Sequence, residues 1–405
     1  MKIAIVGCGF VFDIYMRTLG GYPEIQICGV FDLNVERSSA VSSYYGFSVY
    51  DSYDELLSDK AVQVVVNLTN ISAHYEVSKR ALLAGKHVYS EKPLTKSLNE
   101  SKELFEIAKS RRLILSGAPC NLFGDSMRTL IAAVQNGRIG KPLLVYAELD
   151  DNPIHLMEFE KVRSPTGAPW PVQEEIIEGC TYEHVGYHLV WLCAAFGPVV
   201  SLTSFSKELI ENKCLDLAPF VGTPDFSVAC LNFSSGVTAR VTCSVVAPRD
   251  HRIQIVGTTG ALYSEGYRRF DSPVYLENFS TRSLTARKFS LLERHPQIGA
   301  LFGIKGKIIH SINHHKSSAL HSPSAAKQGI KSKVLEWIRR RQIYAQDKLL
   351  GIWEMRESVN NGCDCSLSPE FLLHINELTI LIQGAGPSGS SCRPETTFSL
   401  ESISK

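Results

Sequence analysis

Several features that mark special classes of protein are scarce in these 405 residues. No stretch approaches the roughly 18 unbroken apolar residues of a membrane-spanning helix, and the apolar start at residues 1–7 is too short for a signal peptide. Net charge is also lacking, because 42 basic residues nearly balance 41 acidic ones. The overall charge therefore does not indicate binding to nucleic acid. With 44% hydrophobic residues, the composition excludes a disordered chain. We expect a soluble, cytoplasmic protein with a packed core.

The cysteines lack the pattern of a disulfide framework or a zinc ribbon. There are eleven, an odd number, scattered from Cys8 to Cys392, and none forms a CxxC pair. The closest two, Cys363 and Cys365, are too tightly spaced for an ordinary structural zinc site. We therefore predict reduced thiols and no metal centre.

The first 122 residues alternate short apolar runs with helical patterns. Runs rich in β-branched residues are typical of strands buried on both faces of a parallel sheet, and their alternation with helices indicates βαβ units. We predict a doubly wound α/β domain over residues 1–122. The expected strands are Lys2–Val6, Ile25–Phe31, Val62–Leu68, His87–Tyr89 and Leu113–Ser116, and the expected helices are Arg37–Tyr45, Ser52–Leu57, Glu76–Ala84 and Leu98–Lys109.

After about residue 122 the rhythm changes. A helical stretch at Asp125–Gln135 is followed by extended runs that turn residues separate, with no crossover helix between most of them. This pattern predicts an α+β domain over residues 123–385, with an open, mainly antiparallel sheet and a helix at Tyr182–Phe196 lying against it. The expected strands are Leu143–Leu149, Val199–Ser206, Ser227–Phe233, Thr238–Val245 and His251–Ile255.

Two segments stand apart by composition. Residues 282–341 contain thirteen Lys or Arg against Glu293 and Glu336 alone, so they form a basic insertion. Such a segment either binds a phosphate-rich ligand or anionic surface, or is a solvated insertion, which is the commoner role of a charge run. Residues 386–405 are rich in Ser, Pro and Gly, and we expect a flexible tail there.

A glycine pair marks a nucleotide-binding turn. Gly7 and Gly9 come directly after the first expected strand and open a helix at Phe10, where glycine permits a tight turn and close approach of a pyrophosphate to the helix N-terminus. The second strand ends in Asp32, the position of a carboxylate that binds the adenosine ribose. Because Asp32 would repel a 2′-phosphate, we expect NAD, although Arg37 lies close enough to keep NADP open. The alternative for Asp32 is a turn residue that caps the next helix.

The third small residue of the GxGxxG pattern is absent. Phe12 stands there, at a position that serves the packing of the helix on the strand and not phosphate contact. The substitution weakens the motif without abolishing it.

Four segments together resemble the Gfo/Idh/MocA oxidoreductases, the family of glucose–fructose oxidoreductase and inositol dehydrogenase. They are Gly7–Gly9, Asn67–His74, Gly85–Pro93 with its Glu-Lys-Pro ending, and Gly179–His188. The resemblance spans residues 1 to about 265 and resumes at 351–383. It implies a Rossmann domain followed by an open, mainly antiparallel α+β domain, a small-molecule substrate, and a homodimer or homotetramer.

The resemblance also implies roles for individual residues. Lys92 is the active-site lysine beside the nicotinamide, where an ammonium favours loss of a substrate proton as hydride leaves, and burial would lower its pKa. His74 and Asn121 fall where the family lines the cofactor cleft, but they could equally be ordinary polar residues of loops. Tyr182 and Tyr187 could equally be core residues whose hydroxyl groups are hydrogen-bonded. The implied cofactor contacts are Phe10, Thr69, Asn70, His74 and Glu91, and the implied substrate contacts are Asn121, Tyr182 and Tyr187.

The second catalytic element of the family is a helix with Asp-x-Gly-x-His. The matching residues here are His184, Gly186 and His188, so the histidine is kept and the aspartate is not. We expect His188 as general acid or base, and His184 to orient substrate or share its proton. Glu183 points about 100° away and is a poor substitute for the missing carboxylate. Because Cys180, His184 and His188 share a helix face, zinc binding stays open as a less favoured alternative.

These features predict an NAD-dependent dehydrogenase or reductase for a secondary alcohol or ketone of a sugar, cyclitol or nucleotide sugar. One alternative is an enzyme that retains its NAD and uses transient oxidation to epimerise a sugar or cleave a glycoside. Another is a non-catalytic protein that senses dinucleotide and binds a partner, which the missing aspartate and the basic insertion fit. Lys92 and His188, both suited to proton transfer, favour catalysis.

Overall fold

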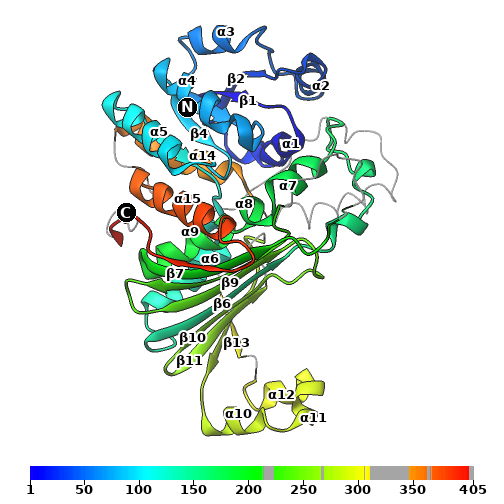
Figure 1. Ribbon diagram of the computed structural model, residues 1–405, viewed down its shortest axis with the longest axis vertical. Helices are drawn as coiled ribbons and strands as arrows, with labels where there is room; N and C mark the ends of the chain where they lie inside the picture. Colours follow the sequence, from blue (N-terminus) through cyan, green and yellow to red (C-terminus); the bar gives the residue numbers. More distant parts are fainter. Residues whose placement is uncertain are drawn as a thin grey trace.

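The computed structural model describes residues 1–211, 213, 223–265, 269–304, 306–310, 346–362, 365 and 367–400. Within these residues the chain builds two β-sheets, each with helices packed on it. Figure 1 shows the smaller sheet above the broader one. Every helix in this described part is too short or too polar to cross a membrane.

The first sheet is parallel, and its described strands lie in the order β2-β1-β3-β4-β5. All residues of β3 are buried, as expected for a strand covered on both faces. The order reverses between β1 and β3, and ligands bind at such a reversal in this class of fold. The predicted doubly wound parallel sheet is confirmed. Its strands are β1 (Lys2–Val6), β2 (Gln26–Phe31), β3 (Val64–Asn67), β4 (His87–Ser90) and β5 (Leu115–Gly117), and its helices are α1 (Phe10–Met16), α2 (Val35–Tyr45), α3 (Tyr53–Ser58), α4 (His74–Leu83) and α5 (Leu98–Ser110).

The second sheet is mixed but mainly antiparallel, as predicted. Its described strands lie in the order β13-β12-β11-β10-β6-β9-β8-β7-β14, and β6 with β9 is the parallel pair among them. Side chains alternate between buried and more exposed along β8, because one face of the sheet is covered by helices (Figure 1). The strands are β6 (Pro142–Asp150), β7 (Val199–Lys207), β8 (Phe226–Phe233), β9 (Thr238–Ser244), β10 (Arg252–Gly257), β11 (Gly260–Glu265), β12 (Val274–Asn278), β13 (Lys307–Ile309) and β14 (Ser390–Cys392).

The helix expected over Tyr182–Phe196 is divided in the structure. It begins as α8 (Cys180–His184) and continues after Val185 as α9 (Gly186–Phe196). Glycine has low helix propensity, which agrees with a boundary at Gly186. All of α9 except Ala195 is buried, so this helix lies in the core between the sheet and the remaining helices. The helices α6 (Asp125–Gln135), α7 (Val172–Glu178) and α15 (Pro369–Gln383) accompany it, and short 3₁₀ turns occur at Leu19–Gly21, Ile71–Ala73, Asn121–Phe123, Ile154–Leu156 and Phe159–Lys161.

Near its end the chain returns to the first sheet. Helix α14 (Leu349–Asn361) buries Leu349, Ile352 and Met355 in the apolar cluster that contains β1. Residues 386–400 differ from the expected flexible tail, because β14 pairs with β7 and the carboxylate of Glu377 accepts hydrogen bonds from the backbone N–H groups of residues 395 and 396. Residues 401–405 lie outside the described part.

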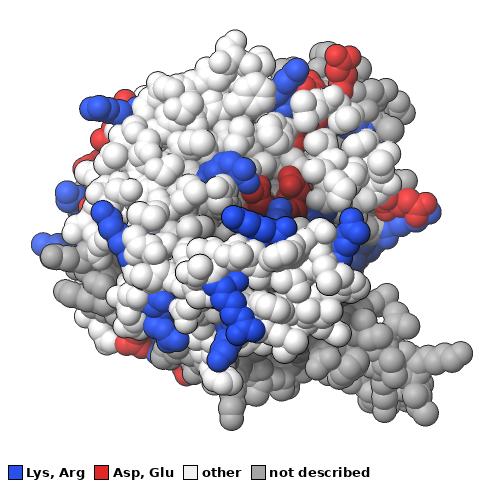
Figure 2. All heavy atoms as spheres, turned by 90° about the horizontal axis from the view of Figure 1, so that it is seen from below, with Lys and Arg blue, Asp and Glu red and all other residues white. Residues whose placement is uncertain are grey.

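The first part of the basic insertion forms an arm at the edge of the second sheet. It contains α10 (Thr281–Ala286), α11 (Ser290–Arg294), α12 (Pro296–Leu301) and then β13, which pairs with β12. Figure 2 shows the molecule from below, with basic side chains spread across the middle of this face. Residues 311–345, which include the rest of the insertion up to residue 341, lie outside the described part. The predicted role of the insertion therefore stays a prediction.

Candidate active site

The glycine turn after β1 leaves open space at the N-terminus of α1. Gly7 has φ +99°, and a Cβ there would lie 2.5 Å from the carbonyl oxygen of Leu68, so glycine is required. Gly9 is the N-cap of α1, and apart from its chain neighbours no heavy atom of the described residues lies within 4 Å of the place its Cβ would take. The turn therefore has room for a pyrophosphate beside the first helical N–H groups.

Asp32 and Arg37 hold this turn from the side of β2. The carboxylate of Asp32 accepts hydrogen bonds from the backbone N–H groups of Cys8 at 2.7 Å and Asn34 at 2.8 Å, and carboxylate oxygens have further lone pairs for a ribose hydroxyl. Arg37 donates to the carbonyl oxygen of Cys8 and to both the carbonyl and hydroxyl oxygens of Thr166. Its guanidinium is thus engaged by protein groups.

A loop from the second half of the chain reaches the same turn. The backbone N–H and hydroxyl of Thr166 donate to one carboxylate oxygen of Asp13 at 3.2 and 2.7 Å. The ring of Phe10, the first residue of α1, stacks on Trp170 with centroids 6.4 Å apart. The predicted cofactor residue Phe10 therefore lies where the two halves of the chain meet.

Phe12, which replaces the third glycine of the motif, is fully buried. Its ring packs edge-on against Tyr45 at 5.9 Å and Phe47 at 6.5 Å. The bulky side chain thus contributes to the core beside α2, while the open space at Gly9 is retained.

His74 ties the loop after β3 to the loop after β4. Its ring nitrogens lie 2.7 Å from the carbonyl oxygen of Pro93 and 3.0 Å from that of Thr69. Burial lowers the pKa of His74, against the effect of both carbonyl groups. The hydroxyl of Thr69 donates to Asn67, whereas Asn70 donates to Glu174 on α7. Through its contacts with Pro93 and Thr69, His74 fixes the two loops relative to each other.

Lys92 forms a buried ion pair with Glu183. The Nζ atom of Lys92, two residues past β4, lies 2.6 Å from an oxygen of Glu183 on α8, and the side chains are 12% and 16% exposed. Burial alone would lower the pKa of Lys92, but Glu183 holds it above its ordinary value. The neighbouring residues Glu183 and His184, which lie about 100° apart on α8, thus have different partners, because Lys92 approaches α8 on the side of Glu183 while His184 lies near Asp151. Tyr187 lies close by, with its ring centroid 5.8 Å from the same Nζ atom.

Glu91 is held by a residue that sequence reasoning missed. Its carboxylate accepts hydrogen bonds from Tyr15 at 2.9 Å and from Lys348 at 2.5 Å, and the second oxygen accepts one from the backbone N–H of Lys92 at 3.1 Å. Burial would raise the pKa of Glu91, but Lys348 and Lys92 lower it to about 2. No local pattern indicated Lys348, which is 257 residues away in the chain.

The two histidines of the family helix have different surroundings. His184 lies 3.4 Å from Asp151, whose other oxygen is 3.5 Å from His251. His188 is fully buried, with one ring nitrogen 3.0 Å from the carbonyl oxygen of Glu148 and the other accepting the indole N–H of Trp191 at 3.1 Å. Burial lowers the pKa of His188 to about 4. The structure thus brings Lys92 together with Glu183, and places His188 in the core beside β6.

The residues of the zinc alternative also have separate partners. The thiol of Cys180 lies 3.6 Å from the carbonyl oxygen of Cys243, while His184 and His188 have the contacts given above. Within the described ranges no three His, Cys, Asp or Glu side chains are arranged as metal ligands. Cys363, of the closely spaced cysteine pair, lies outside those ranges.

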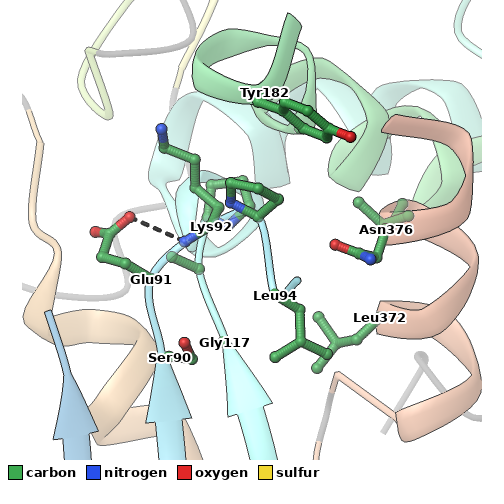
Figure 3. A pocket seen from close by; sticks show the side chains of 13 residues that line it. Ser90, Glu91, Lys92, Leu94, Gly117, Tyr182, Leu372 and Asn376 are labelled. Carbon is green, nitrogen blue, oxygen red and sulfur yellow. Dashed lines mark hydrogen bonds between the residues drawn. The ribbon is translucent and has the colours of Figure 1, made fainter. Parts of the chain in front are cut away.

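A small cavity of about 30 Å³ separates Lys92 from α15. Tyr182 and Asn376 line it, and Figure 3 shows the Lys92 ammonium pointing away from Asn376. The volume suits a water molecule and not a sugar. Asn121 lies nearby in the core, where its side-chain amide donates to the carbonyl oxygen of Tyr187 at 2.8 Å.

Most of the chain matches the models of one protein family. Residues 1–118 match an oxidoreductase family with an NAD-binding Rossmann fold, and residues 127–263 match the GFO/IDH/MocA C-terminal domain. An uncharacterized oxidoreductase of Schizosaccharomyces pombe is 33% identical over 154 residues, 37% of this chain and 42% of that protein. The myo-inositol 2-dehydrogenase of Thermotoga maritima is 24% identical over 272 residues, 66% of this chain and 76% of that protein. The match with the S. pombe relative thus covers less than half of its length.

Solved structures share the fold over almost the whole chain. The WlbA dehydrogenase from Bordetella pertussis, in complex with NADH and UDP-GlcNAcA, has a TM-score of 0.62 at 14% identity over 93% of each chain. KijD10, a 3-ketoreductase from Actinomadura kijaniata in complex with NADP, has a TM-score of 0.65 at 17% identity over 95% of this chain and 97% of that one. The predicted Rossmann domain and the following domain with a mainly antiparallel sheet are confirmed by this similarity.

Proposed function

The chain belongs to the Gfo/Idh/MocA oxidoreductase family, and we propose that it transfers a hydride between NAD and a secondary alcohol or ketone of a sugar, cyclitol or nucleotide sugar. The buried pair of Lys92 and Glu183 carries this proposal, since it puts a proton donor at the carboxyl end of β4. A relative named as a myo-inositol 2-dehydrogenase and a structural neighbour crystallised with UDP-GlcNAcA support the substrate class. In this proposal residues 1–122 bind the cofactor, and residues 123–385 bind substrate and form the oligomer.

The residues of the glycine turn fit the cofactor. NAD, when bound, accepts or supplies the hydride. Gly7 and Gly9 would hold its pyrophosphate, and Asp32 would accept hydrogen bonds from the adenosine ribose. The bonds from Arg37 to Cys8 and Thr166 support a preference for NAD, because they engage the nearby cation that a 2′-phosphate would need.

In this proposal Lys92 donates the proton to the substrate oxygen, and Glu183 keeps Lys92 protonated. Because Glu183 raises the pKa of Lys92, the lysine carries its proton at neutral pH. In ketone reduction Lys92 donates that proton to the carbonyl oxygen as hydride reaches the carbon, and it regains a proton from water afterwards. Oxidation requires Lys92 to start as the neutral amine, which a raised pKa disfavours. The pair therefore favours reduction at neutral pH.

The proposal is tested by following the absorbance of reduced nicotinamide with a panel of ketoses, keto-cyclitols and nucleotide 3-ketosugars. We expect turnover in the native protein, and a loss of roughly 10²–10⁴-fold in Lys92→Met, the scale of lost general acid catalysis. Lys96→Met is the matched control, because Lys96 forms a more exposed pair with Glu178 nearby. Unimpaired turnover in Lys92→Met would falsify the proposal. Conversion without net change in NADH would instead reveal a recycled cofactor.

A further inference from the structure

The residue before the active-site lysine, Glu91, is paired with another buried lysine, Lys348. The Nζ atom of Lys348 is 2.5 Å from an oxygen of Glu91, and the two side chains are 8% and 7% exposed. Glu91 directly precedes Lys92 and accepts a hydrogen bond from the Lys92 backbone N–H. It also accepts one from Tyr15 on α1. One carboxylate thus connects the loop after β4 that carries Lys92, helix α1 after the glycine turn, and the segment before α14.

We propose that Lys348 is a positioning residue that acts through Glu91. By pairing with Glu91, it keeps that carboxylate charged and in place, so that Glu91 orients the backbone from which Lys92 reaches the substrate. The inference deepens the proposed function and rests on it for the catalytic role of Lys92.

Glu91 needs this partner because it is buried. A carboxylate taken out of water is costly unless an opposite charge and hydrogen bonds compensate. Burial would lower the pKa of Lys348, but Glu91 holds it well above the ordinary value, so both groups stay ionised at neutral pH. Without Lys348, Glu91 would either take up a proton or attract the ammonium of Lys92, which it already influences. Because Glu91 is paired with Lys348, the ammonium of Lys92 is available to pair with Glu183 and to contact the substrate.

The segment around Lys348 is itself firmly held. The preceding Asp347 accepts hydrogen bonds from the hydroxyl groups of Thr18 at 2.6 Å and Tyr22 at 2.5 Å. The thiol of Cys120 lies 3.4 Å from the carbonyl oxygen of Asp347, and the ammonium of Lys348 lies 5.4 Å from the centroid of the Tyr15 ring. These contacts attach the segment to the first half of the chain, so Lys348 has one defined position relative to Glu91.

The test compares Lys348→Met, Glu91→Gln, the double variant and Lys348→Arg. If Lys348 acts through Glu91, Lys348→Met lowers kcat by roughly ten- to a hundredfold at saturating NADH, the scale of a misplaced catalytic group, with KM nearly unchanged. In the Glu91→Gln background the same substitution should cost less than threefold, because no buried carboxylate is left unpaired. Lys348→Arg keeps the charge and should recover most of the rate.

Lys86→Met is the matched control for loss of a buried lysine. Lys86 donates to the carbonyl oxygens of Asp59 and Val62 at the opposite end of β4, so its loss should reduce stability and leave kcat unchanged. If Lys348→Met is folded and keeps the native kcat, or if its loss of rate persists in Glu91→Gln, the inference is overturned.

A measurement without substrate separates this inference from the proposed function. In protein labelled with ¹³C at lysine Cε, the resonance of Lys92, assigned with Lys92→Met, should shift in Lys348→Met and stay in place in Lys86→Met. A shift without turnover on any substrate would contradict the proposed function and leave the positioning of Lys92 standing. An unchanged resonance would contradict the positioning role itself.

Discussion

The ammonium of Lys92 lies 2.6 Å from a carboxylate oxygen of Glu183, although 91 residues separate the two in the chain. Lys92 follows a strand of the parallel sheet, and Glu183 lies on a helix that packs on the second sheet. Each group has lost most of its contact with solvent, so each charge depends on the other. The site is therefore assembled where the two halves of the chain meet.

Replacing Glu183 by Gln removes the charge that holds the proton on Lys92. Burial then acts without its main counter-effect, so the pKa of Lys92 falls. A group keeps its proton until the pH rises through its pKa, and the alkaline limb of ketone reduction should accordingly move to lower pH in Glu183→Gln. The profile of kcat/KM against pH measures this. Glu178→Gln, which breaks a more exposed pair with Lys96, should leave the limb in place; an unmoved limb in Glu183→Gln would show that Glu183 does not control the proton.

The two glycines of the turn should fail in different ways when replaced by alanine. Gly7→Ala puts a Cβ against the backbone of Leu68 at positive φ, so it should lower stability as well as NAD affinity. Gly9→Ala meets no atom of the described residues beyond its chain neighbours, so it should leave the melting temperature unchanged and weaken NAD binding at least tenfold, about 1.4 kcal/mol. Calorimetric titration and thermal unfolding distinguish the two. Native affinity in Gly9→Ala would place the pyrophosphate elsewhere.

Arg37→Met tests the choice between NAD and NADP. The guanidinium braces the glycine turn through Cys8 and contacts Thr166, so its loss should weaken NADH and NADPH binding to a similar degree. If Arg37 instead read a 2′-phosphate, the loss would fall on NADPH alone. Parallel titrations with the four nicotinamide cofactors decide this, and we expect the native protein to prefer the unphosphorylated pair.

Acid should destabilise the fold through two buried neutral histidines. His374 accepts the backbone N–H of Val199 at 3.0 Å and contacts Thr396 through its other nitrogen, and burial lowers its pKa to about 4, as for His188. Stability from such a group is full above the ordinary pKa of 6.5 and is lost as the pH falls toward 4. Each histidine contributes a slope of up to about 1.4 kcal/mol per pH unit.

Urea unfolding between these pH values measures the effect. His374→Leu should be less stable than the native protein at neutral pH, because Val199 loses its acceptor, but its stability should fall less steeply with acid. A slope equal to that of the native protein would mean that His374 takes up its proton without cost.

The sequence by itself determined the elements and the most local parts of the site. Alternating β-branched runs and helical patterns are properties of short segments, so the parallel sheet, the glycine turn and the place of Lys92 after a strand were all predictable. The requirement for glycine at position 7 is only partly local, because the positive φ belongs to the turn whereas a Cβ would clash with Leu68 on another segment.

Only the tertiary structure decided which side chains meet. The direction of Glu183 on its helix could be derived, but not that Lys92 would approach from that direction. Likewise the pairing of Lys348 with Glu91, and the engagement of Arg37 by Thr166, join segments that share no pattern in sequence. The physical reason is that a buried charge is costly unless an opposite charge or hydrogen bonds compensate it. Which residue supplies that compensation depends on how distant segments pack.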